Sequence, residues 1–182
     1  DVVIVNLPDP LSYVEAKNYT RYFYRRLGER LEPSGVAAIQ ATSPFRSPRT
    51  FASVERTLRA VGLFTLAYRA PIPMLGDWGF LLAANAPLSV PQRIPQGLTF
   101  LDSPGLARLF QLPTDERSRD PGVVSTLYEL PLVDVFASAH NLESLGRIYL
   151  DMDYYEQAAQ CFEESRELAM ESGHRFIEAV DE

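Results

Sequence analysis

Two short polar loops carry the residues of this sequence that are best suited to chemistry. The stretch DVVIVNLPDP places Asn6 and Asp9 directly after a run of apolar, β-branched residues, and Gln40 follows a similar run in GVAAIQAT. An amide can donate and accept hydrogen bonds, and a carboxylate accepts strong, charge-assisted bonds from cations. Ligands of open α/β sheets bind outside the carboxyl ends of the strands. Residues 6–12 and 40–45 are therefore candidates for a binding site.

The order of the surrounding elements predicts an α/β protein. Residues 1–7 and 35–42 have the composition of fully buried parallel strands, and 63–73 and 78–85 are expected to form an antiparallel hairpin at a sheet edge. Helices are expected over 14–30 and from Ser47-Pro48 to Gly62. Residues 86–138 are rich in proline and turn residues, with one helical piece at 105–112, and are expected to wrap around the sheet.

A glycine-rich strand-to-helix turn, which would hold a nucleotide-like cofactor, is missing from this pattern. The ten glycines never form G-x-G. A ligand at these loops therefore either lacks such a cofactor or is also held by residues outside this sequence. One cysteine and two histidines leave almost no ligands for a Cys/His metal site.

Several stretches in family order resemble the polyamine aminopropyltransferases, the spermidine synthase family. They are DVVIVNLPDPLS, NYTRYFYRRL, LEPSGVAAIQATSPFRSPRTFASV, APIPMLGDWGF and STLYELPLV. The resemblance implies a partial methyltransferase-like Rossmann sheet that holds only the later strands, in a portion covering residues 1–138. It implies transfer of an aminopropyl group from decarboxylated S-adenosylmethionine to a polyamine. The glycine-rich segment for that co-substrate belongs to the family's earlier strands, so no cofactor is expected for this chain alone.

The resemblance also assigns roles to individual residues. The family reads Asp-x-x-Asp-Pro after this strand, where the first Asp is the proposed base and the second binds an amine of the substrate. Here these positions are Asn6 and Asp9. An amide cannot take up a proton at neutral pH, so the substitution puts catalysis in question. Gln40, Tyr19 and Asp77 match further positions that line the family's substrate site.

Other interpretations of these residues remain open. Asp9 before Pro10 also suits an Asx turn, and Gln40 suits a hydrogen-bonded amide at a strand end. Trp78 is expected to pack in the core rather than to form a stacking surface for a ligand. Asn6 also fits a non-catalytic descendant of the family that acts as a scaffold or protein-binding module.

The last part of the chain differs in charge and pattern. Residues 139–182 hold 11 acidic and 3 basic residues, and the whole chain has a net charge of −7. Residues 137–173 resemble one tetratricopeptide repeat, a helical hairpin. Its marker positions are Leu142, Leu145, Gly146, Tyr149, Ala158, Phe162 and Ser165. We therefore expect two domains, 1–138 and 139–182. Cys161 is expected to be a small core residue of the repeat.

These features suggest partners and a location. The expected partners are a polyamine, a protein bound through the repeat, and, as an open question, a second copy of the chain. Nucleic acid is not expected, because the tail is acidic and the arginine-rich helix face lacks interleaved aromatic residues. No apolar run reaches the roughly 20 residues that span a bilayer. The segment is expected to be cytoplasmic, although the most similar branch of the family often carries membrane spans upstream.

Overall fold

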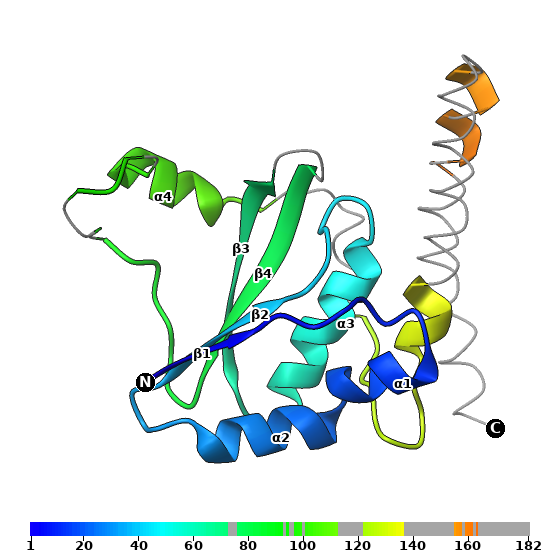
Figure 1. Cartoon of the computed structure of the whole chain (residues 1–182), viewed down its shortest axis with the longest axis horizontal. Helices are drawn as coiled ribbons and strands as arrows, with labels where there is room; N and C mark the ends of the chain where they lie inside the picture. The colour runs from blue at the N-terminus through cyan, green and yellow to red at the C-terminus, as the bar shows by residue number, and fades with distance from the viewer. Residues whose placement is uncertain are drawn as a thin grey trace.

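A four-stranded mixed sheet forms the centre of the molecule (Figure 1). The computed structural model describes residues 1–72, 76–92, 94, 97–99, 101–112, 122–136, 155–157, 159–161 and 163. The strands are β1 (Val2–Val5), β2 (Val36–Gln40), β3 (Phe64–Ile72) and β4 (Gly76–Ala84), in the order β1-β2-β4-β3. β1 and β2 are parallel, and β4 is antiparallel to both β2 and β3. This arrangement is compatible with a methyltransferase-like fold and confirms the hairpin at a sheet edge.

Helices α2 (Arg21–Arg30) and α3 (Pro48–Arg59) cover one face of the sheet. Alternation along the strands directs one set of small and aliphatic side chains to this covered face, and these side chains are buried. The resulting core joins the sheet to the helices and includes Val5, Ala37, Ile39, Leu81, Ala83, Tyr24, Val54 and Leu58. Packing against the covered face therefore fixes the position of α3 relative to the sheet.

The opposite face of the sheet is much less covered by the described residues. Val2 is 75% exposed and Ile4 is 79% exposed. The prediction of a fully buried first strand is therefore wrong for these residues, because β1 lies at the edge of the sheet and one of its faces is not packed. On this face, the ring of Phe110, just after α4 (Ser103–Leu109), lies 5.7 Å from the ring of Tyr68. We call this surface of the sheet the uncovered face.

The helix expected over 14–30 is broken into three pieces. These are α1 (Tyr13–Ala16), the 3-10 helix η1 (Lys17–Tyr19) and α2. The break lies at Thr20, whose backbone is extended and whose Oγ1 accepts a hydrogen bond from the Phe23 amide at 3.4 Å. A threonine cap of this kind starts a new helix in a new direction. The four arginines of α2 are exposed, as expected for a solvated face.

Residues 122–125, within the proline-rich region 86–138, run along α3. The amide of Val123 donates to Ser53 Oγ at 2.9 Å, and the amide of Ser125 donates to Thr57 Oγ1 at 3.1 Å. Arg56 donates to the carbonyl of Gly122 at 2.7 Å. Hydroxyl groups on one side of α3 thus accept hydrogen bonds from the backbone amides of this segment. The segment packs beside the helix rather than over the sheet.

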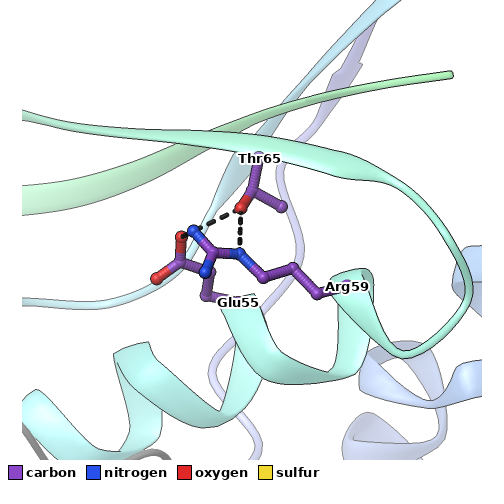
Figure 2. Close-up of polar contacts among 3 residues, drawn as sticks. All are labelled: Glu55, Arg59 and Thr65. Atoms are coloured by element: carbon purple, nitrogen blue, oxygen red, sulfur yellow. Dashed lines mark hydrogen bonds and ion pairs between the residues drawn. The ribbon is translucent and has the colours of Figure 1, made fainter. Parts of the chain in front are cut away.

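A three-residue polar cluster joins the end of α3 to the beginning of β3 (Figure 2). Arg59 donates to Thr65 Oγ1 at 2.7 Å and forms an ion pair with Glu55 at 2.6 Å, and Thr65 donates to Glu55 at 2.9 Å. The cluster lies near the start of β3. This is the end of the sheet where β2 begins, opposite to the end where β2 finishes. It stabilises the scaffold at a distance from the predicted site.

Most of the tail lies outside the described residues, including the predicted domain boundary near residue 138 and the marker positions of the predicted repeat. Residues 155–157, 159–161 and 163 are helical, and Cys161 is buried. Among the described residues, no helix combines the length and the apolar character that crossing a membrane requires.

Candidate functional site

Four segments meet where β1 and β2 end, at the edge of the sheet that is formed by these strand ends rather than by its outer strands. Because β4 is antiparallel to β2, its first residues lie at this edge, together with the last residues of β3. The loop over 6–12 follows β1, and the loop over 41–47 leads from β2 to α3. This edge therefore gathers the two loops that the sequence singled out, as expected for the carboxyl ends of parallel strands.

Asn6 and Gln40 lie next to each other in the register of this edge. The last paired residues of β1 and β2 are Val5 and Ile39, so the next position on each strand is Asn6 and Gln40. Both positions alternate with buried residues and fall on the uncovered face. Asn6 is exposed and Gln40 is partly buried. Continuing the register by one residue therefore brings Asn6, just after β1, and Gln40, the last residue of β2, to neighbouring positions.

Aromatic rings border Gln40 on the same face. Gln40 is directly opposite Phe80 of β4, whose ring stacks on Tyr68 at 5.1 Å with an interplanar angle of 18°. Burial raises the pKa of the Tyr68 hydroxyl, so this side chain stays neutral at physiological pH. Trp78 follows at the next position of this face, and its Nε1 is buried without a hydrogen-bond partner among the described residues. The site therefore has an amide edge and an aromatic side.

Tyr19 lies behind the loop that carries Asn6 and Asp9. Its side chain is 2% exposed, and its hydroxyl donates to the carbonyl of Pro8 at 2.8 Å, with a second carbonyl, that of Leu7, at 3.4 Å. Burial raises the pKa of Tyr19, and the nearby carboxylates of Asp9 and Glu15 raise it further. The hydroxyl therefore remains a hydrogen-bond donor, and it is occupied by the loop backbone.

Asp77 is engaged in an ion pair. Its Oδ2 lies 2.8 Å from Nη1 of Arg69, and both side chains are about one-third exposed. The same guanidinium donates to the carbonyl of Gln111 at 3.0 Å and lies over the ring of Phe45, 5.5 Å from its centroid. Alternation puts Asp77 on the face of β4 opposite to that of Phe80. Asp77 is thus at the same edge as Gln40 but on the other face.

Thr42 lies in the candidate loop 40–45, but sequence reasoning missed its backbone conformation. This residue is 5% exposed and has a φ of 63°, a conformation that a β-branched residue rarely adopts. It follows Gln40 by two positions, and its carbonyl accepts from the Gly79 amide at 2.7 Å. A Cβ at Gly79 would lie 2.7 Å from that carbonyl and 2.6 Å from the Phe51 ring. The pair fixes the loop after β2, and nothing in the local sequence signals the positive φ.

The described residues offer no alternative centre based on a metal. No group of three or more His, Cys, Asp or Glu side chains within that part of the chain could hold a metal ion. The arrangement of the site consists of amides, one carboxylate on a short loop and aromatic rings. Such a set suits a ligand that is cationic and carries hydrogen-bond donors and methylene groups.

Comparisons with known proteins point to one enzyme family. Residues 1–90, which contain all four strands, match the family described as the spermine/spermidine synthase domain. This match supports a relationship between residues 1–90 and the spermidine synthase family. We call residues 1–90 the synthase-like segment.

Curated relatives extend the similarity beyond this segment. A polyamine aminopropyltransferase of Leptospira interrogans is 34% identical over 133 residues, covering 73% of this chain and 26% of that protein. Polyamine aminopropyltransferase 2 of Ralstonia nicotianae is 38% identical over 117 residues, covering 63% of this chain and 23% of that protein. The enzyme of Shewanella oneidensis is 31% identical over 160 residues, covering 87% and 25%. The chain spans about a quarter of the length of these relatives.

Proposed function

We propose that the synthase-like segment forms the amine-binding side of a polyamine aminopropyltransferase. The observation that carries this proposal is the juxtaposition of Asn6 and Gln40 at the carboxyl edge of the sheet, with the Asp9 loop beside them. In the proposed reaction, an uncharged amine nitrogen of a polyamine attacks a carbon next to the sulfonium of decarboxylated S-adenosylmethionine. The new C–N bond forms as the C–S bond breaks, the sulfur leaves with the bonding electron pair as a neutral thioether, and the new ammonium group gives its proton to solvent water.

Asp9 is the residue that we assign to the cationic substrate. Its carboxylate can hold an ammonium group of a diamine by a charge-assisted hydrogen bond. Gln40 offers a neutral donor and acceptor, and the stacked rings of Tyr68 and Phe80 offer an apolar surface for the methylene chain. Tyr19 and Asp77, which the resemblance assigns to the substrate, are engaged with the Pro8 carbonyl and with Arg69. We give Asp9 and Gln40 the main role in binding because they stand in the loop after β1 and at the end of β2, where the resemblance places the amine.

The co-substrate is not assigned to any residue of this chain. The sequence has no G-x-G turn, so the residues present do not fit the usual holder of such a group. We propose that decarboxylated S-adenosylmethionine is bound by a part of the complete protein other than residues 1–182. Two features support this. β1 pairs on only one side within the described residues, and Val2 and Ile4 are exposed on the uncovered face. Packing supplied by further chain would bury both.

Asn6 favours a second candidate function. An amide cannot accept the proton that leaves the amine, and removing a general base costs about two to four orders of magnitude in rate. The chain would then be a non-catalytic descendant that binds a polyamine, with a protein partner recognised through the predicted repeat. The same binding residues serve both candidates, and they differ in whether turnover occurs.

Product analysis tests the proposal. The isolated chain and the complete product of its gene are each incubated with decarboxylated S-adenosylmethionine and putrescine, and the amines are separated by chromatography. We expect no spermidine from the isolated chain, because it lacks a site for the co-substrate. We expect putrescine binding to the complete gene product, measured by calorimetry. Spermidine formation by the isolated chain would refute the division of the site, and the absence of diamine binding would refute the function.

A further inference from the structure

The loop that carries Asp9 is short and strongly restrained. Pro8 and Pro10 flank Asp9, so the backbone torsion φ is fixed on both sides of it. Pro10 is fully buried, and the amide of Leu11 donates to the Asp9 carbonyl at 2.7 Å. The peptide that joins Pro8 to Asp9 is the remaining link between this turn and the end of β1.

Tyr19 holds this peptide directly. Because the Pro8 carbonyl and the Asp9 amide belong to one planar unit, a hydrogen bond to the carbonyl oxygen also fixes the direction in which Asp9 leaves the peptide. The hydroxyl of Tyr19 makes that bond at 2.8 Å from a ring that is 2% exposed. Without the hydroxyl, the Pro8 carbonyl would lose this buried donor. Among the described residues, no other side chain donates to that carbonyl.

The tyrosine itself is anchored to the scaffold rather than to the loop alone. It ends η1, and Thr20 beside it donates to the Lys17 carbonyl at 2.9 Å and caps α2. The amide of Arg21 donates to the Ser125 carbonyl at 2.9 Å. The ring belongs to the same core as Val5 at the end of β1. Tyr19 can therefore transmit the position of α2 to the loop.

We propose that Tyr19 is a positioning residue, whose hydroxyl fixes the Pro8–Asp9 peptide and so aims the Asp9 carboxylate at the amine of the substrate. This inference rests on the proposed function for its substrate. It moves Tyr19 from direct contact with the amine to a role exerted through Asp9. Gln40, on β2, does not depend on this bond.

Tyr24 provides a matched control. It is also a fully buried tyrosine of the same core, on α2, and its hydroxyl has no hydrogen-bond partner among the described residues. Tyr19→Phe and Tyr24→Phe each remove one buried hydroxyl and leave the ring. Only the first removes a bond to the loop. A general effect of losing a buried hydroxyl would therefore appear in both variants.

The first measurement is hydrogen exchange at the Leu11 amide, which reports on the turn itself. We expect exchange to become about fivefold faster in Tyr19→Phe, the effect of losing one ordinary hydrogen bond, and to stay unchanged in Tyr24→Phe. This result does not depend on any substrate. Equal exchange in the two variants would overturn the inference.

The second measurement is putrescine binding and turnover in the complete gene product. We expect Tyr19→Phe to weaken putrescine affinity about fivefold, and to raise KM with kcat unchanged if the protein turns over. Unchanged affinity alongside faster exchange would overturn the role of Tyr19 in positioning Asp9. Failure of the unmodified protein to bind putrescine would instead refute the proposed function, and the inference about the amine with it.

Discussion

Arg69 and Asp77 are paired across β3 and β4, with 2.8 Å between Nη1 and Oδ2. The arginine also donates to the Gln111 carbonyl and lies over the ring of Phe45. One side chain thus ties the loop after β2, the hairpin and the segment after α4 together. The positive charge of Arg69 weakens the attraction of Asp77 for a dication.

The pairing of Asp77 with Arg69 leads to a prediction about how much Asp9 and Asp77 each contribute to putrescine affinity. Asp9→Asn should lower putrescine affinity about tenfold, because the substrate loses a charge-assisted hydrogen bond. Asp77→Asn should change that affinity by less than about twofold, since Arg69 already balances its charge. It should lower the free energy of unfolding by about 0.5 kcal/mol, as for a partly exposed ion pair. Calorimetric titration and urea unfolding measure the two effects. A larger loss of affinity in Asp77→Asn would place the amine beside Asp77 instead.

Restoring a carboxylate at residue 6 should reveal whether Asn6 limits turnover. In the complete gene product, Asn6→Asp is expected to raise the rate of aminopropyl transfer about a hundredfold or more, since the new carboxylate can take up the proton of the amine. Gln92→Glu adds the same charge at an exposed residue and should leave the rate unchanged. Initial rates of spermidine formation decide the matter. Equal rates in Asn6→Asp and the unmodified protein would mean that the base lies elsewhere or that the protein is not an enzyme.

The close approach of Gly79 to Thr42 should make Gly79 intolerant of a side chain. Gly79→Ala would put a Cβ against the Phe51 ring and the Thr42 carbonyl, and we expect a loss of about 1–3 kcal/mol of unfolding free energy. Gly28→Ala, within α2, meets the movable side chain of Leu63 at 3.2 Å and Asn85 Oδ1 at an ordinary contact distance of 3.6 Å, and it gains helix propensity. Urea unfolding should therefore show a loss in the first variant and none in the second. Similar stabilities would argue against the tight pairing after β2.

The buried tyrosines make stability dependent on alkaline pH. Burial is the main cause that raises the pKa values of Tyr19 and Tyr24 above their ordinary value of 10.0. The unfolded chain therefore loses these protons first, so stability is fully present below about pH 10 and is lost as the pH rises through the folded-state pKa values. The unfolding free energy, measured in urea at about pH 8 and pH 10.5, should fall.

A variant comparison assigns this pH dependence to residues. Tyr19→Phe should make the fall between the two pH values smaller, because one group with a raised pKa is gone. Tyr22 is exposed on α2, and Tyr22→Phe should leave the fall as it is in the unmodified chain. If both variants behaved alike, the buried tyrosine would not be the source of the pH dependence.

Local sequence signals predicted the elements of this fold well. The strand-helix-strand-helix-strand-strand order is confirmed, because apolar runs, Pro48 at a helix start and Gly62 at a helix end act over a few residues. The break at Thr20 was missed, because the periodic apolar residues continue across it and outweigh a single capping threonine. Asn6, Asp9 and Gln40 were selected because each follows an apolar run in the sequence, and their role in binding stays a prediction.

The sequence by itself determined the elements, the polar loops and the resemblance to one enzyme family. Only the tertiary structure decided that β4 lies between β2 and β3, that Asn6 and Gln40 share the uncovered face, and that the Tyr19 hydroxyl reaches the Pro8 carbonyl. It also decided that Asp77 is paired with Arg69 and that Thr42 has a positive φ. These relations join residues that are distant along the chain or depend on close packing between strands, so they follow from pairing and burial in three dimensions rather than from local pattern.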